Sequence, residues 1–160
     1  MTESEVDLAG GCDCGAVRYR LTARPMFTHC CHCRWCQRET GSAFAINALI
    51  ETACLDVTGK TDCVETPSES GNGQAIHRCP SCRIALWSHY NGLGAGIAFL
   101  RVGTLDDPTR IRPDIHIYTD TKQPWVAIPA GLPSVPEYYR RSDYWPAEAI
   151  ARLKAARAGD

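Results

Sequence analysis

The stretch Gly10–Leu21, GGCDCGAVRYRL, joins a C-x-C motif to a run in which apolar and basic residues alternate. From Val17 onward, every second residue is apolar and the arginines between them fall on the opposite side, which is the period of a strand with one buried face. Cys12 and Cys14 come directly before this run. The stretch therefore predicts a half-buried strand that starts beside two thiols.

A second cysteine pair, Cys79 and Cys82 in the segment RCPSC, lies far along the chain. The chain has 10 cysteines, and in a reducing compartment such clusters bind metal or do chemistry more often than they form disulfides. The most economical assignment places Cys12, Cys14, Cys79 and Cys82 on one zinc, as a closed tetrahedral site of four thiolates. Such a site joins two distant segments, and its metal binding contributes to the free energy of folding.

The remaining sequence pattern is mostly that of strands. Strand-like runs bounded by Gly, Pro, Asp or Asn occur at 44–50, 84–90, 96–102 and 114–119. No long helix separates them, so antiparallel pairing is favoured. Near the end, Pro146 and Gly159 flank a short helical pattern. We expect a mainly β fold of antiparallel sheets with a short C-terminal helix, in a single domain over residues 1–160.

Residues 65–74, ETPSESGNGQ, are rich in Ser, Gly, Pro and Asn. This composition predicts an exposed loop that is long for a compact domain. We interpret it as an ordinary surface loop, and a lid over a site is the alternative.

Charge and hydrophobicity exclude several classes of partner. The chain carries 17 basic and 18 acidic residues and a formal net charge of -1, so we expect no nucleic-acid partner and no anionic membrane surface. The N-terminal segment has no basic region followed by an apolar stretch, and no apolar run is long enough to span a bilayer. We therefore expect a soluble, cytoplasmic protein, while the sequence leaves its oligomeric state open.

The stretch His29–Cys36, HCCHCRWC, contains a second thiol cluster. Cys31, Cys33 and Cys36 supply three thiolates, and three protein ligands with one exchangeable position is the arrangement of catalytic zinc. Each of three neighbours is a candidate for closing the fourth position, which would make the site structural: Cys30, His29 and His32. Cys30 would do so only with backbone strain, because adjacent side chains usually point apart.

An open site of three thiolates has a definite chemical character. Three thiolates on one divalent zinc leave a formal charge of about -1, which makes the metal a weak Lewis acid for activating water. A thiol from solution is the better fourth ligand, because zinc favours the thiolate and leaves its sulfur nucleophilic. The electrophile we expect is a small aldehyde.

Three residues near this cluster are candidates for binding the thiol substrate. Arg34 and Arg38 share a face if this segment is helical, and their guanidinium groups offer forked donors to a carboxylate. Ser42, which follows Gly41, can place a hydroxyl or a backbone N–H near a bound anion. Solvated arginines and an ordinary turn are the alternative interpretations.

Several segments together resemble the glutathione-dependent formaldehyde-activating enzyme family, which also includes the centromere protein V-like proteins. The resemblance covers roughly residues 8–136 and is carried by GGCDCGAVRY at 10–19, CHCRWCQRETGSAF at 31–44, RCPSC at 78–82, GTLDDP at 103–108, HIY at 116–118 and PW at 124–125. It implies antiparallel sheets in a tent-like arrangement and two zinc ions per chain.

The resemblance also implies roles for the two cysteine sets. Cys12, Cys14, Cys79 and Cys82 match the family's structural zinc ligands, and Cys31, Cys33 and Cys36 match the ligands of the zinc regarded as catalytic. The implied activity is that of a carbon-sulfur lyase, which forms S-(hydroxymethyl)glutathione from glutathione and formaldehyde. A thiol carrier without catalysis and a zinc-stabilised interaction module are the alternatives.

The sequence departs from the family pattern at two positions that bear on these sites. Arg83 follows Cys82 where the family commonly has Gly, so we expect the backbone of Arg83 to avoid the left-handed region that Gly tolerates cheaply. An additional cysteine, Cys30, precedes the triplet and bears on whether its fourth position is open.

Overall fold

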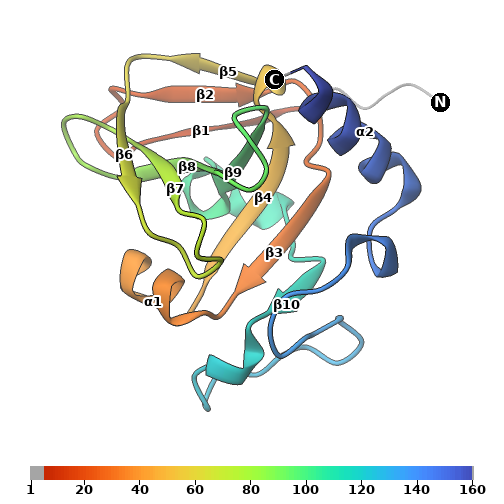
Figure 1. Ribbon diagram of the computed structural model, residues 1–160. Helices are drawn as coiled ribbons and strands as arrows, with labels where there is room; N and C mark the ends of the chain where they lie inside the picture. The colour runs from red at the N-terminus through yellow and green to blue at the C-terminus, as the bar shows by residue number, and fades with distance from the viewer. Residues whose placement is uncertain (1–5, 160) are drawn as a thin grey trace.

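The computed structural model describes residues 6–159 and contains two β-sheets (Figure 1). The three-stranded sheet has the order β1-β2-β5, formed by Leu8–Gly11, Arg18–Leu21 and Leu55–Thr58. The seven-stranded sheet has the order β10-β3-β4-β9-β8-β7-β6. Its strands are β3 Phe27–Cys31, β4 Ala45–Glu51, β6 Asp62–Thr66, β7 Gln74–Arg78, β8 Ala85–Tyr90, β9 Ile97–Arg101 and β10 Ile115–Ile117. The mainly β fold that the sequence predicts is confirmed.

The central strands of the seven-stranded sheet, β4 and β9, are buried on both faces, whereas the edge strand β6 is mostly exposed. Side chains of consecutive strand residues point to opposite faces of the sheet. On one face, Ala48 and Ile50 of β4 pack in a core with Tyr19 and Leu21 of the small sheet. On the other face, Leu49 belongs to a second core that includes the C-terminal helix and the cysteine triplet. The four-cysteine set and the cysteine triplet therefore belong to opposite faces of one sheet.

One pairing differs from the antiparallel arrangement that the sequence predicts. Strand β10 pairs with β3 in parallel, with His116 opposite Cys30, whereas the other strand pairs are antiparallel. A parallel neighbour requires a crossover connection, and residues 102–114 supply it after β9. Within that connection, Tyr19 and Thr104 share a hydrogen bond of 2.7 Å between their hydroxyls, which holds the GTLDDP segment against the small sheet.

The predicted C-terminal helix is α2, Ala147–Ala158, with Pro146 and Gly159 at its caps. It packs against the sheet through the buried Ala149 and Leu153. Arg152 donates from Nε and Nη2 to the two carboxylate oxygens of Glu51 on β4, at 2.7 and 2.6 Å. Apolar contact and a forked ion pair thus hold the helix on the face that carries the triplet.

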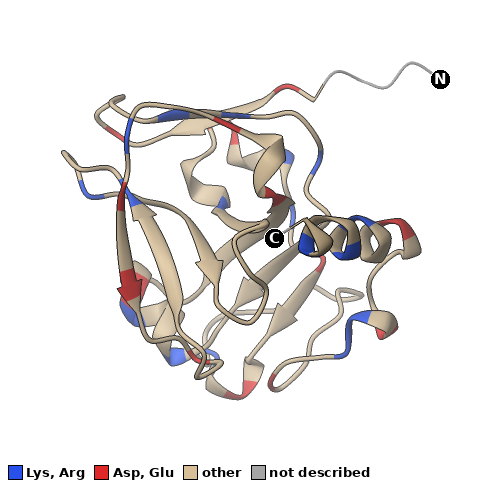
Figure 2. Cartoon of the chain, turned by 45° about the horizontal axis from the view of Figure 1, so that its top comes forward, with Lys and Arg blue, Asp and Glu red and all other residues tan. Residues whose placement is uncertain are grey.

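Acidic and basic residues are interspersed over the molecule (Figure 2). Among residues 6–159, no helix has both the length and the apolar character needed to cross a bilayer. The largest group of basic residues on one helix is that of α2, with Arg152, Lys154 and Arg157.

Candidate metal centres and the adjoining cavity

The four-cysteine set of the sequence analysis comes together where the two sheets meet. Cys12 and Cys14 follow β1, while Cys79 and Cys82 follow β7 of the large sheet, and the four Sγ atoms lie within 4.8 Å of one another. The Cys12–Cys14 and Cys14–Cys79 sulfur separations are both 3.6 Å. A tetrahedral zinc with bonds of about 2.3 Å requires sulfurs about 3.8 Å apart, so this group fits zinc.

The backbone beside this cluster corrects one expectation from the sequence. Arg83 has φ of 68°, in the left-handed region, whereas we expected it to avoid that region. Its N–H donates to the carbonyl of Cys79 at 3.0 Å, which closes the turn that brings Cys79 and Cys82 together. The turn therefore imposes the conformation that Gly adopts cheaply, and the arginine adopts it at a cost in backbone energy.

The cysteine triplet is built where β3 passes into helix α1, Arg34–Thr40. Cys31 ends the strand, Cys33 is the N-cap of the helix, and Cys36 lies one turn further, where its N–H donates to the Sγ of Cys33 at 3.3 Å. Hydrogen bonds from the Cys31 and Cys36 thiols, together with this N–H, lower the pKa of Cys33 to about 3. The local fold thus favours thiolate character at Cys33, whereas the pKa of Cys31 and the pKa of Cys36 are raised.

The fourth position of the triplet is open within the described part of the chain. The potential metal-ligand atoms of Cys31, Cys33 and Cys36 lie within 4.8 Å of one another, and no other His, Cys, Asp or Glu of the described residues joins this group. Cys30 and His32 belong to a different group. The reason is strand alternation, because Cys31 points to the face of α2 and its strand neighbour Cys30 points to the opposite face. Three thiol ligands with no fourth fit a metal that keeps one exchangeable position.

A cavity of about 420 Å³ opens beside the triplet. Its wall combines the three thiols with aromatic and apolar side chains and a few polar groups, including His29, Asn47, Tyr90, Phe99, Ile117, Tyr118, Tyr138 and Arg141. Binding sites for small molecules have this composition and size, because apolar walls supply affinity and a few polar groups set orientation.

Two groups in the wall are suited to bind a polar ligand. Arg141 lines the cavity, and its guanidinium carbon lies 5.9 Å from the centroid of the Trp145 ring, so a positive charge adjoins the space in which a ligand would bind. Burial raises the pKa of the Tyr118 hydroxyl to about 12, so this hydroxyl stays a donor near neutral pH. Tyr118 also has φ of 55°, and strained backbone of this kind is typical of functional sites.

His29, a sequence candidate for the fourth ligand, instead lines the cavity wall. Its Nε2 lies 2.6 Å from the hydroxyl of Tyr139, which also accepts from the indole N–H of Trp145 at 2.6 Å. Burial lowers the pKa of His29 to about 3, so the ring is neutral near neutral pH. This chain of hydrogen bonds fixes the orientation of the ring, and we assign His29 a role in shaping the cavity.

The residues that the sequence analysis proposed for binding the thiol substrate lie outside the cavity. Arg34, Arg38 and Ser42 are exposed, and none of them belongs to the cavity wall. Arg34 and Arg38 do lie on one helix as expected, but Arg34 donates to the side-chain oxygen of Gln37 at 2.5 Å. The cation in the wall is Arg141, which sequence reasoning missed because it lies far along the chain without a motif.

The predicted surface loop contributes to the cavity. Residues 65 and 66 end β6 and residue 74 begins β7, so the loop itself is shorter than the sequence suggested. Glu69, Ser70 and Asn72 line the cavity, and Asn91 donates from Nδ2 to the carbonyl of Asn72 at 2.8 Å. The segment is therefore an exposed loop, as the sequence predicts, and part of it forms one side of the cavity wall.

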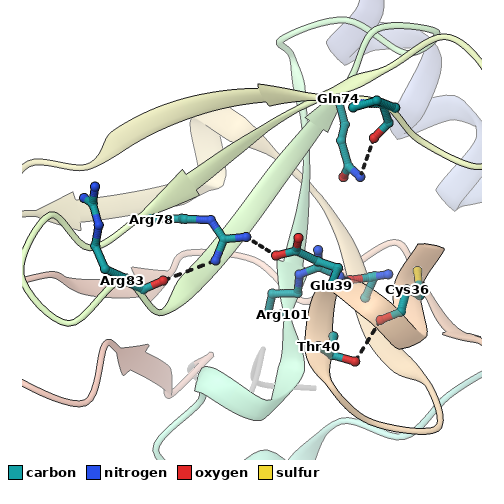
Figure 3. A network of polar contacts seen from close by, with 9 residues as sticks. Cys36, Glu39, Thr40, Gln74, Arg78, Arg83 and Arg101 are labelled. Carbon is teal, nitrogen blue, oxygen red and sulfur yellow. Dashed lines mark hydrogen bonds and ion pairs between the residues drawn. The ribbon is translucent and has the colours of Figure 1, made fainter. Parts of the chain in front are cut away.

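An ion pair connects the two cysteine clusters through the fold. Arg78 on β7, directly before Cys79, pairs with Glu39 on α1, and its Nη1 donates to the carbonyl of Arg83 at 3.2 Å (Figure 3). Within α1, the hydroxyl of Thr40 donates to the carbonyl of Cys36 at 2.8 Å. The helix that carries the triplet is thus tied to the turn that carries the four-cysteine set.

Two comparisons with known proteins name the same family. A family profile described as glutathione-dependent formaldehyde-activating enzyme matches residues 7–121. A protein of Halomonas elongata, provisionally named a glutathione-dependent formaldehyde-activating enzyme, is 27% identical over 133 residues, which cover 76% of this chain and 80% of the relative. A crystal structure of a Rhodobacter sphaeroides protein covers 66% of this chain and 91% of its own, at 20% identity and a TM-score of 0.47, a likeness too weak to inform the site.

Proposed function

We propose that this chain, which belongs to the glutathione-dependent formaldehyde-activating enzyme family, is a zinc-dependent carbon-sulfur lyase that joins glutathione or a similar small thiol to formaldehyde or another small aldehyde. The observation that carries the proposal is the open group of three thiols, Cys31, Cys33 and Cys36, in the wall of a cavity of about 420 Å³. An open metal position beside a cavity is the arrangement of a catalytic site.

Zinc held by the triplet would supply a position at which a substrate thiol is favoured as its thiolate. The four cysteines between the sheets would hold a second, structural zinc, because a closed set of four thiolates leaves no position for a substrate. The proposal therefore assigns two zinc ions to these two clusters, one for each task.

The residues of the cavity would bind and orient the substrates. Arg141, which lines the cavity, is placed to receive a carboxylate of the thiol substrate, because guanidinium groups bind carboxylates with directional hydrogen bonds. Tyr118 offers a hydroxyl that stays protonated near neutral pH and can donate to the carbonyl oxygen of the aldehyde. The apolar wall and the loop at Glu69 and Asn72 limit access of water.

The reaction is an addition in which all atoms are retained. The sulfur of the thiol forms a bond to the carbonyl carbon, the carbonyl π bond breaks, and its electron pair goes to the oxygen. The proton that the thiol loses ends on that oxygen, so the product is a thiohemiacetal, which carries an S-hydroxymethyl group when the aldehyde is formaldehyde. Donation from Tyr118 would stabilise the charge that develops on the oxygen.

The test is the variant Cys33→Ala, with Cys63→Ala as the matched control, because Cys63 is exposed and outside both clusters. We expect Cys33→Ala to keep the wild-type circular dichroism spectrum and to lose both glutathione binding and acceleration of adduct formation at fixed free thiol. Cys63→Ala should retain both. Normal turnover by Cys33→Ala would refute the assignment, and glutathione binding by the wild type without acceleration would make the protein a carrier.

A further inference from the structure

A third group of metal-type ligands lies on the other side of β3 from the triplet. It consists of Cys30 and His32, which flank Cys31 in the sequence, and His116 of β10, and the three ligand atoms lie within 4.8 Å of one another. We propose that these residues form a third metal site, which takes zinc or a similar divalent transition-metal ion. The inference does not depend on the proposed function of the triplet.

The placement follows from the register of two strands. Cys30 and His116 are directly opposite each other in the parallel pair of β3 and β10, so their side chains share one face of the sheet. His32 lies two residues beyond Cys30, which returns its side chain to that same face. Three ligands therefore converge from two neighbouring strands.

The distances within the group fit a tetrahedral ion. The Sγ of Cys30 lies 3.6 Å from the Nε2 of His32, and zinc bonds of about 2.3 Å to sulfur and about 2.0 Å to nitrogen give a separation of about 3.5 Å. The Nε2 of His32 lies 2.8 Å from the Nδ1 of His116. Metal binding would widen this second distance to about 3.3 Å.

Burial favours an ion over a simple hydrogen bond between the two rings. Cys30, His32 and His116 are 1%, 0% and 6% exposed, so water does not reach the Sγ of Cys30 or the two facing ring nitrogens, which are the Nε2 of His32 and the Nδ1 of His116. Burying polar groups costs free energy unless their lone pairs are satisfied. A single proton shared between the rings serves two of the three groups, whereas an ion would satisfy the thiolate and both nitrogens together.

The ligand set indicates the class of metal and a structural role. One thiolate and two imidazoles are borderline-soft ligands that suit zinc and its neighbours. The ring of Phe44 contacts the ring of His32 at a centroid distance of 5.5 Å, which encloses the group. Because β10 ends at Ile117 and is followed by Tyr118, both of which line the cavity, an ion here would hold that wall against β3.

The experiment is zinc content together with zinc-edge X-ray absorption on the full-length protein, purified after expression with added zinc. The two thiol clusters have no histidine ligand, so scattering from imidazole reports the third site alone. We expect three zinc ions per chain and imidazole scattering in the wild type. Two zinc ions with sulfur coordination alone would overturn the proposal, whatever the activity of the triplet.

Substitution of single ligands tests whether Cys30 and His116 hold the third ion. We expect Cys30→Ala and His116→Gln each to bind two zinc ions and to lose the imidazole signal, while Cys63→Ala keeps three ions. Retention of three ions and the imidazole signal in both ligand variants would refute the assignment. Because the wild-type spectrum tests the site by itself, poor folding of one variant would not remove the test.

Discussion

At the scale of single residues, Arg141 offers the clearest test of how the cavity recognises a thiol. A hydrogen bond to a charged group contributes roughly 1.5–3 kcal/mol, which corresponds to a change in affinity of roughly ten- to a hundredfold. We therefore expect Arg141→Gln to raise the KM for glutathione by about that factor, while the rate with 2-mercaptoethanol, which has no carboxylate, changes little.

Arg34→Gln and Arg38→Gln are the matched controls, because both arginines are exposed and lie outside the cavity wall. Steady-state kinetics with glutathione and with 2-mercaptoethanol distinguish Arg141 from the two control arginines. An equal loss with both thiols in Arg141→Gln would assign Arg141 to the shape of the cavity and not to carboxylate binding.

Arg83 gives a second prediction at this scale, because its left-handed backbone stores strain. Replacement by Gly removes the steric penalty, which is about 1–2 kcal/mol for an L-residue in this region, although Gly also loses more entropy on folding. The side chain makes an exposed ion pair with Asp62, so Arg83→Ala is the control that loses this contact and keeps the strain. We expect Arg83→Gly to be more stable than Arg83→Ala by about 1 kcal/mol in urea unfolding, and equal stability would mean that the turn relaxes.

At the scale of elements, the important contact is the one between α2 and β4. Burial raises the pKa of Glu51, but the hydrogen bonds and the charge of Arg152 outweigh it, so the pKa is lowered on balance from 4.5. A carboxyl group with a lowered folded-state pKa stabilises the fold above its unfolded pKa, and this contribution disappears as the pH falls through the folded-state value.

We expect Glu51→Gln to lower the free energy of unfolding at pH 7 by about 1 kcal/mol, a magnitude reduced by the partial exposure of the pair. The difference from the wild type should be constant above pH 6 and should shrink as the pH falls below 4.5. Urea unfolding between pH 3 and pH 7 measures it. A difference that does not change with pH would show that lost packing, and not charge, is the cause.

At the scale of the whole molecule, the four-cysteine cluster joins the small sheet to the large one. Cys12 and Cys14 follow β1 and Cys79 and Cys82 follow β7, so removal of a metal there would release one sheet from the other. Domains of this size are stable by only about 5–15 kcal/mol, and a structural zinc contributes a comparable free energy.

We therefore expect Cys79→Ala to lose cooperative thermal unfolding and near-ultraviolet circular dichroism, whereas Cys33→Ala keeps both. A strong chelator should have the same effect on the wild type as Cys79→Ala, and added zinc should reverse it. An unchanged Tm for Cys79→Ala in differential scanning calorimetry would show that the apolar core alone holds the two sheets together.

The sequence by itself determined the mainly β fold and the grouping of its cysteines. Alternation in AVRYRL marks β2, Pro146 and Gly159 mark the ends of α2, and tight spacing keeps Cys31, Cys33 and Cys36 within one turn. These features are local, because strand period, helix caps and short cysteine spacings depend on residues close together in the chain. The sequence also predicted that the motif with Cys12 shares one metal site with the motif that contains Cys79, since a motif of two thiols needs a second such motif to complete a tetrahedral site.

Only the tertiary structure decided which face each ligand occupies and what surrounds it. Strand alternation alone would place His116 and Tyr118 on one face, but β10 ends at Ile117 and Tyr118 has a left-handed backbone, so His116 joins Cys30 while Tyr118 lines the cavity. The sequence also did not predict that Arg141 lines the cavity or that β10 pairs with β3 in parallel. The physical reason is that strand register, crossover connections and contacts between distant segments arise from burial of the whole chain, which no local pattern encodes.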